Sequence, residues 1–599
     1  IYSADYYDSN KRIVKSLSSR VNGGMDTYAT EYSFQGSPLS VLHTHTDSSG
    51  YSLTERYTYT YDHSSRLTRV SHQYDNNPSV LLVEHAYDEL GRLQTDKLDN
   101  GIYATDYAYN IRNWLTGIEG GKFSQSLHYT DGLGVPCYNG NISSMTWKSG
   151  AGATPRGYKF SYDRLGRLTD AEYGEGPSLS VNTNRFNEQV TGYDKMGNIL
   201  GLKRYGQTSA TGYDVIDDLS LSYVGNRLKK VADRSGTSAF NNGFEFKDGV
   251  DLSTEYEYDE NGNLTKDLNK KKTAIQYNCL NLPSRVMFAN GNSISYLYDA
   301  AGRKLRTVHF LEGDSVTTDY CGNVVYENGV PQILLTEVGY VSLTDGQYHY
   351  YLKDHQGNNR VVVAEEGTVE EVNDYYPFGG LMSTSSRQSV QPYKYNGKEL
   401  ETACGVNWYD YGARRYDPVL GRWNGVDPLC EDYYSENPYG YCGNNPVNYV
   451  DPNGLMKVLY NPDGTYKETT HNNWFHNTFM GRQEYIDYGD RKVHLSESEF
   501  WQWQRSGSYE NVGPVTDFVS NLELTLNEPA ANFADGVAKY MVSSAYSSIN
   551  SPKVWLTGRS WAGTYATPDE RAGGFIDVAT QRLPAVHLLK QLHPGSWYK

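Results

Sequence analysis

Five histidines near the end of the chain are the first residues whose chemistry invites a function. An imidazole titrates near neutral pH and binds metals, so such residues suit a nuclease as general base or ligand. Their spacing does not favour this, because no H-x-x-x-H or HNH-like pattern with supporting acids occurs. We therefore expect surface histidines at all five positions. They are His471, His476, His494, His587 and His593.

The sequence also lacks other catalytic patterns. Six scattered cysteines form no C-x-x-C pair, which argues against a zinc ribbon or a disulfide scaffold. Nucleophile elbow, metal-ligand cluster and phosphate loop are likewise not found. We therefore expect no cofactor and no bound metal, and an independent hydrolase is disfavoured.

Composition and charge restrict the class of protein further. The 599 residues include 55 tyrosines and 58 glycines, and the net charge is −17. Residues 456–599 hold 13 Lys and Arg against 15 Asp and Glu, so the acidity belongs almost entirely to the preceding region. We expect no nucleic-acid binding by that region and no strongly basic nuclease in the tail.

Neither membrane nor export signals are visible. No apolar run approaches 18 residues, so we expect no transmembrane segment. The chain opens on Ile1-Tyr2-Ser3 within repeat-like sequence, without an initiator Met or a signal peptide. We expect it to be the C-terminal part of a longer product.

The elements that would position any site are organised by a repeat, Tyr-Asp-x-x-Gly-Arg/Asn-Leu. Its period of about 20 residues is too short for a two-helix unit and predicts one β-hairpin per unit. The copies are YDHSSRL (61–67), YDELGRL (87–93), YDRLGRL (162–168), YDKMGNI (193–199), YDENGNL (258–264) and YDAAGRKL (298–305).

Turn chemistry accounts for the repeated residues. The Asp carboxylate can cap a turn, and Gly three positions later tolerates the positive φ that closes a hairpin. Flanking runs such as YTYTY at 57–61 alternate with the period of two that indicates strands. We interpret the Tyr and Asp of the repeat as structural.

These motifs resemble the RHS/YD repeat family over about residues 50–380. In that family the hairpins coil into a large hollow shell that sequesters a C-terminal polypeptide. The resemblance implies an all-β fold, in which residues 1–373 form a spiral of hairpins as a hollow shell or part of one.

Residues 374–455 carry different motifs that resemble the RHS repeat-associated core, which plugs the shell. They are DYYPFG (374–379), YNGKEL (395–400), NWYDYGARRYDP (407–418), GRW (421–423), DPL (427–429), NNPVN (444–448) and DPNG (451–454).

The resemblance to the core also implies chemistry. In cleaving bacterial relatives two core aspartates act as an aspartyl-protease-like pair, which here corresponds to Asp427 and Asp451. The scissile bond is then Leu455–Met456. Two departures favour a purely structural plug instead: the first motif, with Leu429-Cys430, lacks a Gly, and Val450 stands where those relatives carry Arg.

Residues 456–599 form a variable C-terminal region, expected to be small and mixed α/β or α-rich. Apolar residues at three- and four-residue spacing predict helix over 514–548. Residues 555–580 include LTGRSWAGT (556–564) and DERA (569–572), similar to the Thr-Gly motif of pre-toxin segments. No catalytic toxin domain is identifiable.

The resemblance suggests a carrier in a bacterial polymorphic-toxin system, secreted or at the cell surface, that acts in intercellular competition. Its partners would be its own enclosed C-terminal region, an immunity protein and a component of a secretion apparatus. The alternative is a cell-surface or secreted binding and adhesion protein that uses the shell as a recognition platform. Tyr-rich faces suit carbohydrate as a ligand of such a platform.

Overall fold

The computed structural model divides the chain into two compact units. The first comprises Ile1–Thr470 with Ser496–Arg505, and the second comprises His471–Leu495 with Ser506–Lys599. The structure describes residues 2–150, 153–236, 238–241, 244–386, 391–431, 435–455, 457–460, 466–469, 485–487 and 492–494. In the second unit these include one antiparallel hairpin, made of β38 (Tyr485–Asp487) and β39 (Lys492–His494).

The first unit begins with a sheet of 18 antiparallel strands among its described residues. Each strand pairs with the next along the chain, as successive hairpins require. The strands are β1 (Ser3–Tyr7), β2 (Ile13–Ser19), β3 (Met25–Tyr32), β4 (Pro38–Thr46), β5 (Ser52–Tyr61), β6 (Leu67–Tyr74), β7 (Val80–Tyr87), β8 (Leu93–Leu98), β9 (Tyr103–Tyr109), β10 (Leu115–Gly120), β11 (Phe123–His128), β12 (Ser144–Ser149), β13 (Arg156–Tyr162), β14 (Leu168–Glu175), β15 (Glu188–Tyr193), β16 (Ile199–Gln207), β17 (Tyr213–Val224) and β18 (Arg227–Asp233).

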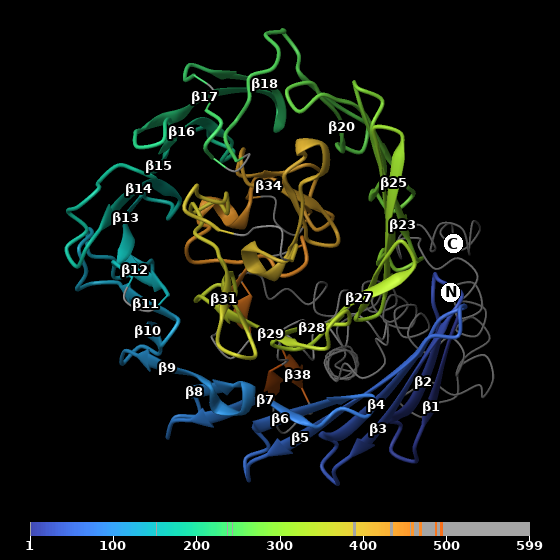
Figure 1. Cartoon of the computed structure of the whole chain (residues 1–599). Coiled ribbons are helices and arrows are strands. Elements are labelled where there is room, and N and C mark those ends of the chain that lie inside the picture. Colours follow the sequence, from blue (N-terminus) through green and yellow to red (C-terminus); the bar gives the residue numbers. More distant parts are fainter. Residues whose placement is uncertain are drawn as a thin grey trace, which may run out of the picture. The chain divides into compact units, whose positions relative to one another are not determined.

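A second sheet of 13 antiparallel strands follows in the same sequential order. Its strands are β19 (Tyr256–Tyr258), β20 (Leu264–Asp267), β21 (Lys272–Tyr277), β22 (Pro283–Phe288), β23 (Ser293–Tyr298), β24 (Lys304–Leu311), β25 (Asp314–Cys321), β26 (Val324–Glu327), β27 (Val330–Leu335), β28 (Gly339–Ser342), β29 (Tyr348–Lys353), β30 (Asn359–Ala364) and β31 (Val369–Val372). Within the first unit, the strands of both sheets follow one another around the residues that come after β31 (Figure 1).

Those later residues, 374–455, contain little regular structure and contact both sheets. Arg204 Nη2 on β16 donates to the Pro418 carbonyl at 3.0 Å, and Lys304 Nζ on β24 donates to Glu399 Oε2 at 2.7 Å. Their short sheet and 3-10 turns are β32 (Glu399–Glu401), β33 (Trp408–Asp410), β34 (Arg415–Asp417), β35 (Arg422–Trp423), η2 (Tyr395–Gly397), η3 (Ala403–Gly405) and η4 (Cys442–Asn444). Further described elements are η1 (Asp99–Gly101), β36 (Val458–Tyr460) and β37 (Tyr466–Thr469).

The repeat motif forms the turn that the sequence predicts. Asp88 Oδ1 accepts the amides of Leu90 and Arg92, both at 2.9 Å, while Oδ2 accepts Arg92 Nε at 2.7 Å. Gly91 takes a φ of +80°, which a side chain would strain. Related carboxylate-capped turns occur at Asp62, Asp163, Asp194, Asp259 and Asp299.

The repeat tyrosine then joins each unit to the one before it. The Tyr87 hydroxyl donates to the Leu67 carbonyl at 2.8 Å, and the Arg66 guanidinium lies 4.7 Å from the Tyr87 ring centroid. Arg167 covers Tyr193 in the same way at 4.2 Å. The motif therefore closes its own hairpin and also fixes the spacing between hairpins.

Removing one such carboxylate is expected to weaken the shell locally. Asp163→Ala loses the hydrogen bonds to the Leu165 and Arg167 amides and to Arg167 Nε. We expect the free energy of unfolding to fall by about 2 kcal/mol, measured from urea transitions by circular dichroism. Leu165→Ala, at an exposed turn tip, is the control and should change it by less than about 0.5 kcal/mol. Equal transitions for both variants would contradict this role.

The structure confirms the all-β shell of hairpins. In the ranges given above, no helix is long and apolar enough to cross a bilayer. The predicted helix over 514–548 and the pre-toxin-like stretch over 555–580 lie outside the described residues. The predicted boundaries at 373/374 and 455/456 stay predictions.

Candidate functional site

Asp427 sits in a turn that follows β35. Its amide donates to the Pro438 carbonyl at 3.0 Å, and its Oδ1 accepts the Leu429 amide at 2.8 Å. The Cys430 amide returns to the Asp427 carbonyl at 3.0 Å. The turn therefore closes without the glycine that cleaving relatives have, and Asp427 Oδ2 is left for other partners.

Asp451 caps the loop that precedes the predicted scissile bond. Its Oδ1 accepts the amides of Asn453, Gly454 and Leu455 at 3.2, 2.7 and 3.1 Å. Gly454 has a φ of +80°, and a Cβ there would approach the Arg414 amide nitrogen to 3.0 Å. The DPNG sequence thus holds Leu455 against the carboxylate by local hydrogen bonds.

Arg414 brings the two aspartates together. Its Nη2 donates to Asp427 Oδ2 at 2.9 Å and to Asp451 Oδ2 at 3.5 Å, so both carboxylates share one nitrogen. Its Nε donates to the Gly454 carbonyl at 2.5 Å, and its guanidinium lies 4.2 Å from the Trp423 ring centroid. The predicted pair is therefore one cluster with a cation between its members.

The pKa values of both carboxyl groups are raised. Burial raises the pKa of Asp451 to about 6, the nearby Asp427 charge adds to this rise, and Arg414 opposes it. Burial also raises the pKa of Asp427, again against the lowering effect of Arg414. Near pH 6 the cluster can therefore hold a proton on one carboxyl group while the other is ionised.

A small cleft that admits water opens onto this cluster. Arg414, Asp427, Asp451 and Leu455 line it together with Cys442. Burial raises the pKa of the Cys442 thiol well above its ordinary value, which disfavours a thiolate nucleophile. Carboxylates, a guanidinium and water are the chemically competent groups at this place.

The sequence prediction named the two aspartates and missed the arginine. The prediction treated Val450 as a departure because cleaving relatives carry Arg there, but Arg414, in the bend between β33 and β34, supplies a cation to both carboxylates. The signal was available in the GARRYDP stretch: an arginine in a core motif is rarely buried without carboxylate partners. Arg414 is only 5% exposed.

The structure does not describe the side chains of the five histidines considered in the sequence analysis. His471, His476, His587 and His593 lie outside the described residues. His494 lies on β39, but its side chain is not among those described. The described cysteines form no disulfide, in line with their scattered spacing.

Comparison with known proteins gives the fold a family. The family model described as the teneurin YD-shell matches residues 137–447. Salivary gland surface protein 1 of Aedes aegypti is 31% identical over 227 residues, which cover 34% of this chain and 7% of that protein. Toxin subunit YenC1 of Yersinia entomophaga is 28% identical over 230 residues, 37% of this chain and 22% of that subunit.

A solved structure supports the same architecture. The Tc holotoxin pore of Photorhabdus luminescens matches with a TM-score of 0.55 at 17% identity, over 77% of this chain and 25% of that chain. At this identity the likeness concerns the fold. Because the family model covers more than half of a chain whose hairpin turns are built on Tyr-Asp, this protein belongs to the teneurin YD-shell family.

Proposed function

We propose that this chain is the shell and plug of an RHS-type toxin carrier, which shelters its own variable C-terminal region, residues 456–599. Two similarities support the proposal: the relative YenC1 is a toxin subunit, and the fold resembles a part of the Tc holotoxin pore. Contacts of residues 374–455 with strands of both sheets, by Pro418 with Arg204 and by Glu399 with Lys304, support a plug role for that segment.

We also propose that the plug releases the C-terminal region by cutting Leu455–Met456. The observation that carries this step is the sharing of Arg414 by Asp427 and Asp451, beside Leu455. Two neighbouring carboxyl groups, one to give a proton and one to accept it, are the elements of aspartyl-type hydrolysis.

The roles follow from the environments. Asp451, whose pKa burial raises to about 6, is assigned as the acid, and Asp427, held 2.9 Å from Arg414 Nη2, is assigned as the base. The base takes a proton from water as the water oxygen attacks the Leu455 carbonyl carbon, and the acid protonates the carbonyl oxygen. As the tetrahedral intermediate collapses, Asp427 gives the proton it took from water to the leaving amine and the C–N bond to Met456 breaks. One hydroxyl proton of the intermediate returns to Asp451, which leaves a carboxylic acid on Leu455 and both aspartates in their starting states. Arg414, whose Nη2 lies 3.5 Å from Asp451 Oδ2, stabilises the carboxylate that forms on Asp451 when it gives up its proton.

A plug that does not cleave would make some of the same contacts. The three amides on Asp451 Oδ1 are ordinary turn capping, and Arg414 would then neutralise two buried carboxylates. The two roles make different predictions for a variant that keeps the shape and hydrogen bonding of the turn but loses the acid.

Asp451→Asn is that variant. Intact mass spectrometry of the purified wild-type chain at pH 6 should show a fragment that begins at Met456, and this fragment should be lost in Asp451→Asn. Asp410→Asn is the control, since Asp410 is half-buried and belongs to a separate ion-pair network with Lys304 and Arg415. Uncut wild-type chain would remove self-cleavage and leave the carrier proposal standing.

We place this carrier outside the cell that makes it, as a secreted or cell-surface component of intercellular competition. An immunity protein for the producing cell and a secretion-apparatus component are the partners that this role requires. Co-purification of the full-length product from its source, with and without a small protein encoded beside it, tests for them.

A second candidate is a surface binding or adhesion protein with carbohydrate as ligand. Its support is that the relative from Aedes aegypti is a surface protein by name. Glycan-array binding by the intact, uncleaved chain would favour this role, and absence of glycan binding together with a Met456 fragment would favour the carrier.

A further inference from the structure

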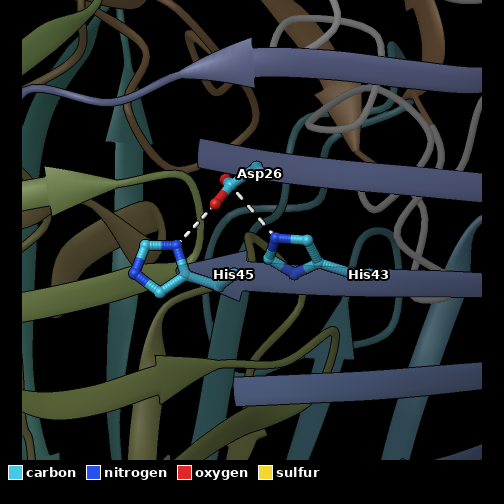
Figure 2. A group of neighbouring side chains, drawn as sticks. All are labelled: Asp26, His43 and His45. Carbon is cyan, nitrogen blue, oxygen red and sulfur yellow. Dashed lines mark hydrogen bonds and ion pairs between the residues drawn. The ribbon is translucent and has the colours of Figure 1, made fainter. Parts of the chain in front are cut away.

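Asp26, His43 and His45 form a buried cluster on strands β3 and β4, far in sequence from the aspartate pair. His43 and His45 are two residues apart on β4, so both side chains project from the same face. Asp26 is the cross-strand partner of His45. Figure 2 shows the Asp26 carboxylate between the two imidazoles. None of the three side chains is more than 1% exposed.

The outer ring nitrogen of each imidazole is held by a different neighbour. His43 Nδ1 lies 2.6 Å from Glu55 Oε1, and His45 Nε2 lies 2.6 Å from the Tyr326 hydroxyl. These contacts orient the rings so that the inner nitrogens, His43 Nε2 and His45 Nδ1, face Asp26. Metal-binding histidines are oriented in this way, by a carboxylate or hydroxyl on the nitrogen that does not bind the metal.

His43 Nε2 is the atom that this network leaves over. It is buried, makes no hydrogen bond to the described residues, and lies 3.4 Å from Asp26 Oδ2. Metal–ligand bonds of about 2.0–2.1 Å in a tetrahedral site place neighbouring ligand atoms about 3.3 Å apart. The His45 Nδ1–Asp26 Oδ1 distance is 2.5 Å, so that pair must open by less than about 1 Å to admit an ion.

We propose that Asp26, His43 and His45 bind a divalent transition-metal ion of the Zn²⁺ class, with water as a fourth ligand. Two imidazoles and one carboxylate are a donor set that such ions accept. The sequence alone predicted no metal site, because Asp26 is brought to the two histidines only by strand pairing.

The neighbouring charges define the competing state of this cluster. Arg20 is ion-paired to Asp26 Oδ2, the oxygen that lies 3.4 Å from His43 Nε2, and Oδ1 faces His45 Nδ1. A metal must therefore compete with Arg20 or with the His45 contact for the carboxylate. Between Asp26 and Glu55, a proton is favoured on His43, and the metal must displace it. Without a metal, the cluster would therefore be an ion pair in which protonated His43 bridges Asp26 and Glu55. The test must separate these two states.

The metal site would lie where the two sheets meet. β3 and β4 belong to the first sheet, whereas Tyr326, which orients His45, lies on β26 of the second. Asn323, next to β26, donates to Glu55 at 2.7 Å and so fixes the carboxylate behind His43. Occupancy should therefore stiffen the junction between β4 and β26, independently of any cleavage at Leu455.

The experiment uses the whole untagged chain, refolded at pH 8 with excess Zn²⁺ or Co²⁺ and then freed of loose metal by gel filtration. Elemental analysis should find one Zn²⁺ per wild-type chain. The Co²⁺ form should absorb in the visible region with the intensity of a four-coordinate site. His45→Gln should lower metal content at least tenfold.

His85→Gln is the matched control, because His85 pairs with Asp96 at 2.5 Å on the same sheet but, among the described residues, belongs to no group of three metal-binding side chains. It should keep the wild-type metal content. Metal-free wild-type chain after refolding with excess Zn²⁺ would overturn the proposal, as would equal metal in His45→Gln. The wild-type Co²⁺ spectrum decides the question even if a variant fails to fold.

Discussion

Replacing Arg414 by methionine is expected to slow release of the Met456 fragment at least a hundredfold. The guanidinium contacts both acids and the Gly454 carbonyl, so its loss removes the charge that stabilises the carboxylate forming on Asp451 as it gives up its proton. Loss of a single donor of this kind typically costs a hundredfold to a thousandfold in rate. Timed intact-mass spectra of wild type and variant measure the effect.

The pH profile distinguishes this role from a structural one. In the wild type, the rate should fall as pH rises above about 6, because Asp451 loses the proton that it donates. Arg414 lowers the pKa of both carboxyl groups, so without it both values rise. The residual cleavage of Arg414→Met should therefore extend to higher pH than that of the wild type.

Two further variants control for folding. Arg414→Lys keeps a charge without the fork of the guanidinium and should recover part of the rate. Arg415→Met removes a neighbouring buried arginine that binds Asp410 and stacks on Tyr296, neither of which belongs to the cluster. If Arg415→Met and Arg414→Met slow cleavage equally, with unchanged pH profiles, Arg414 has no specific part in cleavage.

Arg204→Met is expected to give the largest loss of stability. Arg204 Nε donates to Glu188 at 2.6 Å, Nη1 to Asp217 at 3.0 Å and Nη2 to the Pro418 carbonyl at 3.0 Å, all in a buried site. Glu188 also accepts the Phe378 amide at 2.9 Å. The cluster therefore fastens strands β15–β17 to the core segment that they surround.

Methionine in place of Arg204 leaves Glu188 and Asp217 buried without their cation. Breaking a buried ion pair on one side costs about 3–5 kcal/mol, which we expect as the loss in free energy of unfolding at pH 7. The deficit should shrink as pH falls, because both folded-state pKa values lie above their unfolded values and protonation removes the buried charges. Burial already raises the pKa of Asp217 to about 6 in the wild type.

Urea unfolding at pH 7 and pH 5, followed by circular dichroism, measures this. Arg234→Met is the control, since Arg234 is largely exposed and pairs with Asp218 at 3.4 Å. It should change the free energy of unfolding by less than about 1 kcal/mol at either pH. A loss in Arg204→Met that does not depend on pH would contradict the charge argument and point to packing alone.

The repeat could be predicted from the sequence because its contacts are local. Asp88 binds amides two and four residues ahead, so the residue types and their spacing contain the whole turn. The alternation of residue types with a period of two along the flanking segments is also a local pattern, and it predicts the strands of each hairpin. The shell and the aspartate pair were predicted from the resemblance of the motifs to a known family, not from local patterns.

Only the tertiary structure decided which charged groups meet. Arg414 reaches Asp427 and Asp451 because the short core strands and two capped loops converge, and no spacing rule relates the three positions. The contact of Arg204 with the Pro418 carbonyl likewise joins residues far apart in the chain. Buried charges are stabilised by whatever partners the packing brings within about 3 Å, and packing depends on the path of the whole sheet. A repeating sequence therefore determines each hairpin, while the buried clusters depend on how the hairpins assemble.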